Sequence, residues 1–244
     1  MRGFLFAAAG PLLVVALWEA IVRALVVPVY VLPAPSAIVL KVWTDLPALL
    51  GGLSTTLMEA SIGYAIGAAG ALILAMLFVL YPRLERVALP ALVALNSVPV
   101  VAFAPVALLW FGSGPASKIA MVTIAVGFAV FVNAHQGLCS VDESAANLLR
   151  SFGAGPLRLM VLLRLPAALP SIMNGLRVAV VRSMIIAIVA EMLGAVSGLG
   201  WTIFESTQQM DFLRAWAAIA VASAASMAWY GLVNWIDHRF VFWR

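Results

Sequence analysis

The chain has 244 residues, of which 65% are hydrophobic and only 10% charged, and its mean hydropathy is +1.11. Soluble globular domains are about half apolar and a quarter charged, so these few charges could not cover the surface of a water-soluble fold. The composition therefore excludes a soluble protein and predicts that lipid surrounds most of the chain.

The net charge and the cysteine count narrow the class further. In a lipid-embedded chain, the formal net charge of +4 is explained by arginine-rich cytoplasmic loops, so we expect no nucleic-acid partner. The single cysteine, Cys139, excludes an internal disulfide and a cysteine-cluster metal site. Two histidines, His135 and His238, do not make a metal site either.

The apolar runs are long and continuous, which favours helices over the ten-residue alternation of a closed barrel. A bilayer core of roughly 30 Å needs about 20 residues per helix. We therefore predict an all-α integral membrane protein with about six transmembrane helices, forming a single domain over residues 1–244. The first apolar run exceeds the length typical of a signal peptide, so we expect it to stay in place. The expected spans are near 5–28, 53–80, 87–111, 117–138, 168–195 and 213–236.

Basic residues predict the orientation of these spans. With the N-terminus inside, eight arginines fall on the cytoplasmic side and three basic residues fall outside, which follows the positive-inside rule. Both termini and the loop at about 139–167 are therefore expected in the cytoplasm. The cytoplasmic set is Arg2, Arg83, Arg86, Arg150, Arg158, Arg164, Arg239 and Arg244, and the outer set is Lys41, Lys118 and Arg214.

The first half of the 139–167 loop has a helix-start and a helix-stop signal. The segment from Ser140 to Glu143 has the form of a capping box, which predicts a helix that runs to Phe152. Gly153 and Gly155 are expected to end it, because glycine accepts the left-handed conformation found after helix ends.

The second half predicts another short helix and a return to the membrane. Pro156 suits the first turn of this helix, and Pro166 and Pro170 predict a bend into the fifth span. Two short helices joined at a glycine hinge are well shaped to dock into a groove of a soluble partner. The alternative is an amphipathic connector that lies on the lipid headgroups.

The loop also resembles the coupling motif of ABC importer permeases, the binding-protein-dependent transport inner-membrane family. That motif reads E-A-A, three residues, glycine, nine residues, I-x-L-P. Here Arg150-Ser151-Phe152-Gly153 is followed at the proper spacing by Leu165-Pro166, whereas Asn147 stands at the family's glutamate and Leu148-Leu149 at its alanines.

Similarity to the nitrate, sulfonate and taurine-type branch of this family extends over nearly the whole chain. It is carried by Leu32-Pro33-Ala34-Pro35-Ser36, by the run from Pro105 to Gly112, by Val189-Ala190-Glu191-Met192 and by Ser197-Gly198-Leu199-Gly200. The resemblance implies a transport subunit, not an enzyme, in the bacterial cytoplasmic (inner) membrane.

The resemblance also implies partners and coupling residues. The loop would be the coupling helix that sits in a cleft of a cytoplasmic ATPase dimer. An extracytoplasmic solute-binding protein and a second copy of the permease, as a homodimer, are implied as well. No G-x-x-x-x-G-K-[ST] segment occurs, so the partner would use ATP and Mg, and the chain itself needs no cofactor. The implied coupling residues are Asn147, Arg150, Ser151, Gly153, Ala154, Leu165 and Pro166.

Polar residues inside the spans suggest a translocation pathway. A charge in the membrane costs about 2.5–3.5 kcal/mol on insertion scales. Arg182 and Glu191 point to nearly opposite sides of the fifth span, so one is expected to line a pathway while the other pairs with a neighbouring helix. Asn96 and Ser97 interrupt the third span near Pro99 and Pro105, where the helix is expected to kink. Such an interruption indicates either pathway residues or a kink that serves packing.

Other intramembrane groups have structural interpretations. Glu19 and Arg23 lie four residues apart and can pair on the first span. Glu59 is expected to reach the outer headgroups and Arg177 the cytoplasmic ones. Gly63, Gly67 and Gly70 on the second span are suited to close helix packing.

The sequence does not decide the identity of the solute, and it leaves one other class of transporter as an alternative. The expected solute is a small organic or inorganic anion such as a sulfonate, taurine or nitrate, and the alternative is a vitamin precursor. An ion-coupled carrier or channel without an ATPase is the alternative class, although no internal repeat is visible. An intramembrane enzyme is excluded because no histidine lies deep in a span beside a serine, and the aspartates lie at span ends or in loops.

Overall fold

A computed structural model describes the backbone of residues 2–240 and the side chains of residues 10–239. Arg244 and the side chain of Arg2, both counted in the cytoplasmic basic set, lie outside the described residues. Within the described range the chain is almost entirely helical and contains no strand, which confirms the all-α class.

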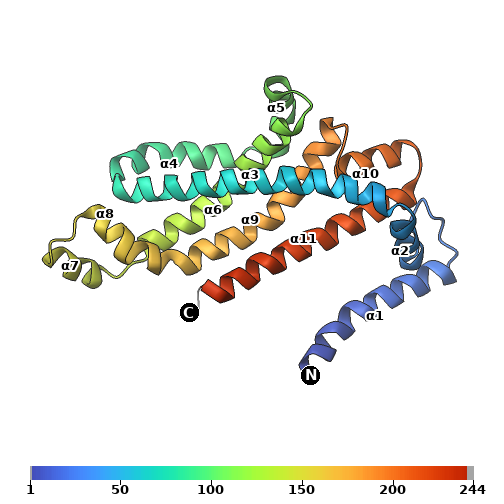
Figure 1. Cartoon of the computed structure of the whole chain (residues 1–244), viewed down its shortest axis with the longest axis horizontal. Helices are drawn as coiled ribbons and strands as arrows, with labels where there is room; N and C mark the ends of the chain where they lie inside the picture. The colour runs from blue at the N-terminus through green and yellow to red at the C-terminus, as the bar shows by residue number, and fades with distance from the viewer. Residues whose placement is uncertain (1, 241–244) are drawn as a thin grey trace.

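Three long helices form the centre of the molecule (Figure 1). These are α3 (Leu46–Leu80), α6 (Pro115–Cys139) and α9 (Leu165–Gly194), with α11 (Phe212–Phe240) alongside α9. Their shared core is built largely from alanine, with Phe78 and Val122 as fully buried larger side chains. Lipid is as apolar as a leucine side chain, so helices in a membrane associate through close van der Waals packing of small residues.

Two glycines bring α3 and α6 together. A Cβ atom on Gly63 would lie 2.6 Å from the Cβ atom of Val122, and one on Gly67 would lie 2.6 Å from the carbonyl oxygen of Thr123. The close-packing interpretation is confirmed for these two residues. It is wrong for Gly70, because nothing lies within 4 Å of a Cβ atom built there.

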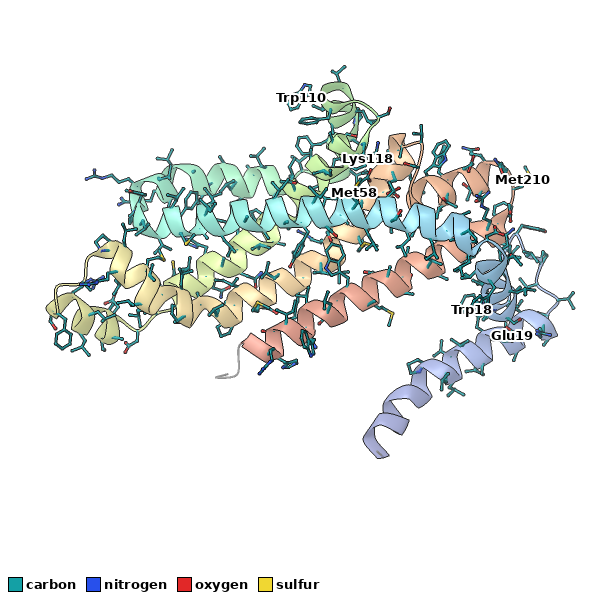
Figure 2. The ribbon with its side chains drawn as sticks, in the orientation of Figure 1. Trp18, Glu19, Met58, Trp110, Lys118 and Met210 are labelled. Atoms are coloured by element: carbon teal, nitrogen blue, oxygen red, sulfur yellow. The ribbon has the colours of Figure 1, made fainter. Side chains whose placement is uncertain are left out.

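The expected third span is broken far more sharply than a kink. It consists of α4 (Pro82–Asn96), a 3-10 turn (Val100–Phe103) and α5 (Ala104–Phe111), and the two halves meet at 88°. Pro99 interrupts the ladder of backbone hydrogen bonds at the break. As a result α5 projects sideways from the bundle, with Trp110 near its tip (Figures 1 and 2).

The number of spans stays a prediction. Among the described residues three helices are long and apolar enough to cross a membrane, or five if each of two bent pairs counts as one span. The second bent pair joins α9 to α10 (Leu199–Gln208) at 46°. The expected first span corresponds to α1 (Arg2–Ala24), which lies apart from the bundle along most of its length (Figure 1).

The C-terminal end of α1 is tied to α2 (Pro35–Thr44) through Glu19. The expected ion pair between Glu19 and Arg23 is present. The same carboxylate accepts a hydrogen bond from the backbone N–H of Ser36 at 3.0 Å, in the first turn of α2, and another from the Ser36 hydroxyl at 2.7 Å. A carboxylate at a helix N-terminus is favourable because it satisfies N–H groups that have no partner within the helix.

Two of the three outer basic residues are neutralised by aspartates. Lys41 Nζ lies 3.1 Å from Asp45 and 3.4 Å from Asp211, and Arg214 lies 3.8 Å from Asp45. The hydrogen bond to Asp45 raises the pKa of Lys41. These pairs join α2 to the start of α11, so the outer charges are used locally to hold two helix ends together.

The α3–α6 contact predicts a position-specific effect of alanine. Gly67→Ala should destabilise the fold by about 1–3 kcal/mol, because the added Cβ atom meets backbone rather than a flexible side chain. Thermal unfolding of the purified chain in detergent measures this. Gly70→Ala is the matched control, and it should be neutral or slightly stabilising because alanine favours the helix. Equal losses at both positions would contradict the packing.

Candidate coupling and transport site

The loop at 139–167 begins with a helix whose cap differs from the expected one. Helix α7 (Glu143–Ser151) is capped by Asp142, whose Oδ1 accepts a hydrogen bond from the Ser144 N–H at 3.1 Å. The prediction of a Ser140 cap is therefore wrong. The Ser140 hydroxyl instead donates to the Gly137 carbonyl at 2.9 Å and closes the end of α6. Asp142 takes the role because it directly precedes the helix and its short side chain reaches the first turn.

Gly153 ends α7 as expected, and its conformation requires glycine. Its φ is +81°, in the left-handed region that other residues rarely adopt. Its N–H donates to the Arg150 carbonyl at 2.9 Å, and the Ala154 N–H donates to the Leu149 carbonyl at 3.0 Å. Gly155 has φ of −73° and caps the following helix, so its predicted part in ending α7 is wrong.

The chain returns to the membrane without the expected bend at the prolines. Helix α8 (Pro156–Leu159) continues through a π-helical stretch (Met160–Arg164) into α9. The Leu165 N–H donates to the Met160 carbonyl, five residues back. A π turn shifts the hydrogen-bond register where Pro166 cannot donate, which explains why the proline does not break the helix. Arg164 donates to the Leu138 carbonyl at 3.1 Å and so fixes the base of the loop to the end of α6.

The structure brings five of the seven implied coupling residues to the tip of this loop. Asn147, Arg150, Ser151, Gly153 and Ala154 lie on α7 or in the turn after it, at one end of the molecule (Figure 1). Arg150 donates to the Asn147 side-chain oxygen at 2.7 Å. The other two, Leu165 and Pro166, lie at the base of the loop in the first turn of α9.

The sequence indicated an apolar side on the second short helix, including Leu157, and the tip exposes Leu148 and Phe152 as well. Leu148, Phe152 and Leu157 lie beyond the long helices of the bundle, and their side chains are 59%, 77% and 68% exposed. Ala146 and Leu159, in contrast, are buried. The combination of exposed apolar side chains with Arg150 and Arg158 is typical of a surface that binds a protein partner. The apolar run within an otherwise polar loop was the available signal.

The expected pathway residues lie in two different environments. Asn96 and Ser97 are exposed at the end of α4, and Arg182 is exposed near the middle of α9. The Arg182 guanidinium has one long contact, 3.5 Å to the Ala125 carbonyl. Glu191, in contrast, is fully buried, so the fifth span carries one exposed and one enclosed ionisable group. The pathway role of these four residues stays a prediction.

Glu191, near the C-terminal end of α9, lies in a buried polar cluster with residues from the N-terminal parts of α3, α6 and α10. The Thr56 hydroxyl donates to its two oxygens, at 2.7 and 3.0 Å, and the Gly200 N–H donates at 2.6 Å. Glu59 and Lys118 are only 2% and 1% exposed in the same region. The expectation that Glu59 reaches the headgroups is therefore wrong. The reason is that Glu191 and Lys118 provide polar neighbours inside the protein.

The glycines of the Ser197–Gly200 segment are required by this carboxylate. Gly198 has φ of +103°, and a Cβ atom there would overlap the carboxyl group of Glu191. A Cβ atom on Gly200 would overlap the Ile188 carbonyl and lie 2.7 Å from the Glu191 Cβ atom. The backbone must therefore approach Glu191 closely to donate the Gly200 N–H, and only glycine permits it.

Arg177 pairs inside the bundle rather than reaching the headgroups. Its guanidinium lies 3.2 Å from the Asp237 carboxylate and donates to the Asn234 side chain, also at 3.2 Å, on α11. Asp237 is 1% exposed. The prediction of a snorkelling Arg177 is wrong because the neighbouring helix supplies a carboxylate within reach, which the sequence of one helix alone does not reveal.

Comparison with known proteins assigns the family. Residues 67–242 match the model described as binding-protein-dependent transport system inner membrane component. The match covers well over half of the chain, so the chain belongs to this family.

Full-length relatives agree with this assignment. An ABC transporter permease protein of Haemophilus influenzae is 34% identical over 95% of this chain and 96% of its own. The formylaminopyrimidine transport permease protein of Halalkalibacterium halodurans is 33% identical over 96% of this chain and 93% of its own. A permease of Bacillus subtilis named for aliphatic sulfonates transport is 29% identical over 100% of this chain and 88% of its own.

A solved structure has the same fold. A chain from the crystal structure of an amino acid ABC transporter superposes with a TM-score of 0.66 at 18% identity, over 82% of this chain and 98% of that one. The predicted resemblance is thus confirmed. The chain is a membrane permease subunit of an ABC importer, ATP is hydrolysed on a separate subunit, and the alternative of a carrier without an ATPase is wrong.

The geometry around Glu191 predicts the cost of a side chain at Gly198. Gly198→Ala should destabilise the permease by about 2 kcal/mol or more, since it adds backbone strain at positive φ to an overlap with the carboxyl group. Gly114→Ala is the control, because it lies in the same outer region with open space around it. Size-exclusion profiles after stepwise heating measure both. A Gly198→Ala variant as stable as Gly114→Ala would contradict the described cluster.

Proposed function

We propose that two copies of this chain form the membrane pathway of an importer for a small anion, driven by an ATPase dimer that docks on α7. The importer receives its solute from an extracytoplasmic binding protein. Both termini and the α7–α8 loop lie in the cytoplasm, in agreement with the excess of arginine on that side. ATP and Mg are used by the ATPase, and the permease itself needs no cofactor.

The observation that carries the proposal is the shape and composition of the α7–α8 loop. It extends past the ends of the long helices (Figure 1), is closed by a left-handed glycine and is fixed at its base by Arg164. Its tip exposes Phe152 and Leu157 beside basic side chains. An amphipathic helix of this kind fits a hydrophobic groove on a partner, where burial of the aromatic side chain supplies much of the affinity.

The second copy is supported by the unpacked face of α4 and α5. Helix α4 has no buried residue, and α5 projects sideways with Leu109 and Trp110 82% and 74% exposed. Asn96 and Ser97 lie on the same segment. Polar groups in a membrane face protein or a water-filled cavity rather than lipid. A second copy that covers this face would enclose Asn96 and Ser97 in a shared pathway.

The expected anion rests on Arg182. An arginine in the middle of a membrane helix costs several kcal/mol unless it meets water or a negative group. Arg182 is exposed and has no ion pair among the described residues. It is therefore placed to meet an anionic solute in the pathway. The sulfonate-transporting relative fits this interpretation, and the formylaminopyrimidine-transporting relative keeps a vitamin precursor as the second candidate.

The coupling role predicts that Gly153→Asp abolishes ATP-driven uptake. The substitution replaces the residue that permits the turn after α7, so the tip is expected to lose its orientation while the spans stay folded. The assay is solute uptake and stimulation of ATP hydrolysis in proteoliposomes that contain permease, ATPase and binding protein.

Gly155→Asp is the matched control for this experiment. It adds the same charge to the same tip but at φ of −73°, with open space around the position. We expect it to keep most of the activity. Full stimulation by the Gly153→Asp complex, with its subunits still copurifying, would contradict the coupling assignment.

The anion proposal predicts different consequences for two arginines of α9. Arg182→Gln should raise the KM for uptake of an anionic solute about tenfold or more while the fold is retained, because a charge-assisted contact to the solute is lost. Arg177→Gln should instead lower the thermal stability, because it leaves the buried Asp237 carboxylate without its charged partner. Unchanged uptake by the Arg182→Gln variant would favour an uncharged solute such as a vitamin precursor.

A further inference from the structure

Two glutamates, one of them the predicted pathway residue Glu191, contact one another inside the protein. Glu59 on α3 and Glu191 on α9 are 2% and 0% exposed, and their carboxyl groups are in hydrogen-bonding contact. Two carboxylate groups have no proton to donate, so a hydrogen bond between them requires that one be protonated. Two negative charges in contact would also repel each other strongly in a buried site.

The surrounding donors indicate that Glu191 is the ionised partner. Its oxygens accept from the Thr56 hydroxyl at 2.7 Å and from the Gly200 N–H at 2.6 Å. The Leu199 N–H donates to the Thr56 oxygen at 2.9 Å, and the Thr56 hydroxyl lies closer to Glu191, at 2.7 Å, than to its other acceptor, the Gly52 carbonyl, at 3.1 Å. Several donors aimed at one carboxyl group favour its charged form.

Glu59 has the opposite surroundings. Its Oε2 atom is buried and has no hydrogen-bond partner, and no backbone N–H is described as donating to the group. A buried charge without donors is far more costly than a buried neutral carboxyl group. The proton of the pair therefore belongs on Glu59.

Lys118 completes the charge balance. Its ammonium group, 1% exposed, lies at the base of α5 where α6 begins (Figure 2). It donates to the carbonyl of Gly194 at 2.8 Å, to that of Gly114 at 3.3 Å and to that of Ser113. Its positive charge interacts electrostatically with both Glu59 and Glu191. One ammonium and two carboxyl groups are neutral as a set only when a single proton is bound.

We propose that Glu59 is a proton-binding site, and that the bound proton allows Glu59, Glu191 and Lys118 to form a neutral buried cluster. Among the described residues, Lys118 on α6 is the charged group that faces the pair, and α10 contributes the Gly200 N–H. The cluster joins α3 to α9, holds α10 through Gly200 and holds the α5–α6 turn through Lys118. Loss of the proton leaves one uncompensated negative charge in the interior and loosens these outer elements.

Infrared spectroscopy of the full-length chain in lipid nanodiscs tests the site without any solute or partner. A protonated buried carboxyl group has a C=O stretching band, separate from carboxylate bands, that shifts in deuterated water. We expect this band in the wild type and its loss in Glu59→Gln, which imitates the neutral carboxyl group. Glu205→Gln, a partly exposed glutamate on α10, should leave the band in place.

Stability as a function of pH gives a second measurement. The folded chain holds a proton that an exposed glutamate releases near pH 4, so stability is retained at low pH and is lost as pH rises. Between about pH 4 and the pH at which the folded site releases its proton, the unfolding equilibrium constant should increase about tenfold for each pH unit, and it should level off above that pH. Glu59→Gln should remove this pH dependence, and Glu205→Gln should keep it.

Either measurement can overturn the proposal. A wild type without the protonated-carboxyl band excludes it, as does a band that persists in Glu59→Gln. If Glu59→Gln fails to fold, the wild type alone decides. Its stability must then fall with rising pH as long as the band is present and level off at the pH where the band disappears, and a stability that is independent of pH while the band is present contradicts the site.

Discussion

Each ionisable group within the bundle must find its partner inside the protein, because lipid provides none, and the arrangement of the helices reflects this constraint. On insertion scales a charge in the membrane centre costs about 2.5–3.5 kcal/mol. Arg177 meets Asp237 of α11, and Glu191 meets Thr56 of α3 and the backbone of α10. Lys118 meets three carbonyl oxygens at two helix ends. These contacts fix which helices are neighbours, while the alanine and glycine faces fix how closely they approach.

The same constraint separates a stable frame from the parts that face a partner. The frame is the packed set α3, α6 and α9, whose charges other than that of Arg182 are satisfied internally. The single chain does not cover the exposed side chains of α4 and α5, and it does not cover Arg182. The α7–α8 loop is continuous with α9 through the π-helical stretch and is fixed to α6 by Arg164. A force applied to the tip of the loop would therefore be transmitted directly to two helices of the frame.

Much of this could be predicted from the sequence, because lipid imposes strong patterns on a chain. Composition correctly predicted the all-α membrane class, the apolar runs predicted the long helices α3, α6, α9 and α11, and the glycine after Phe152 correctly marked the end of α7. Contacts between distant helices could not be predicted. The headgroup roles expected for Glu59 and Arg177 were wrong because their partners, Glu191 and Asp237, lie on other helices. Pro166 was misread since a π turn, not visible in composition, absorbs it.

Hydrogen–deuterium exchange of the permease, with and without its ATPase, tests the central claim most directly. Docking on α7 predicts that the backbone amides of residues 143–159 become protected when the ATPase binds. In the absence of nucleotide, the amides of α2 and α10 should keep their exchange rates. If ATPase binding leaves the exchange rates of residues 143–159 unchanged and instead protects amides elsewhere on the chain, the account is contradicted, because the ATPase then acts on another surface.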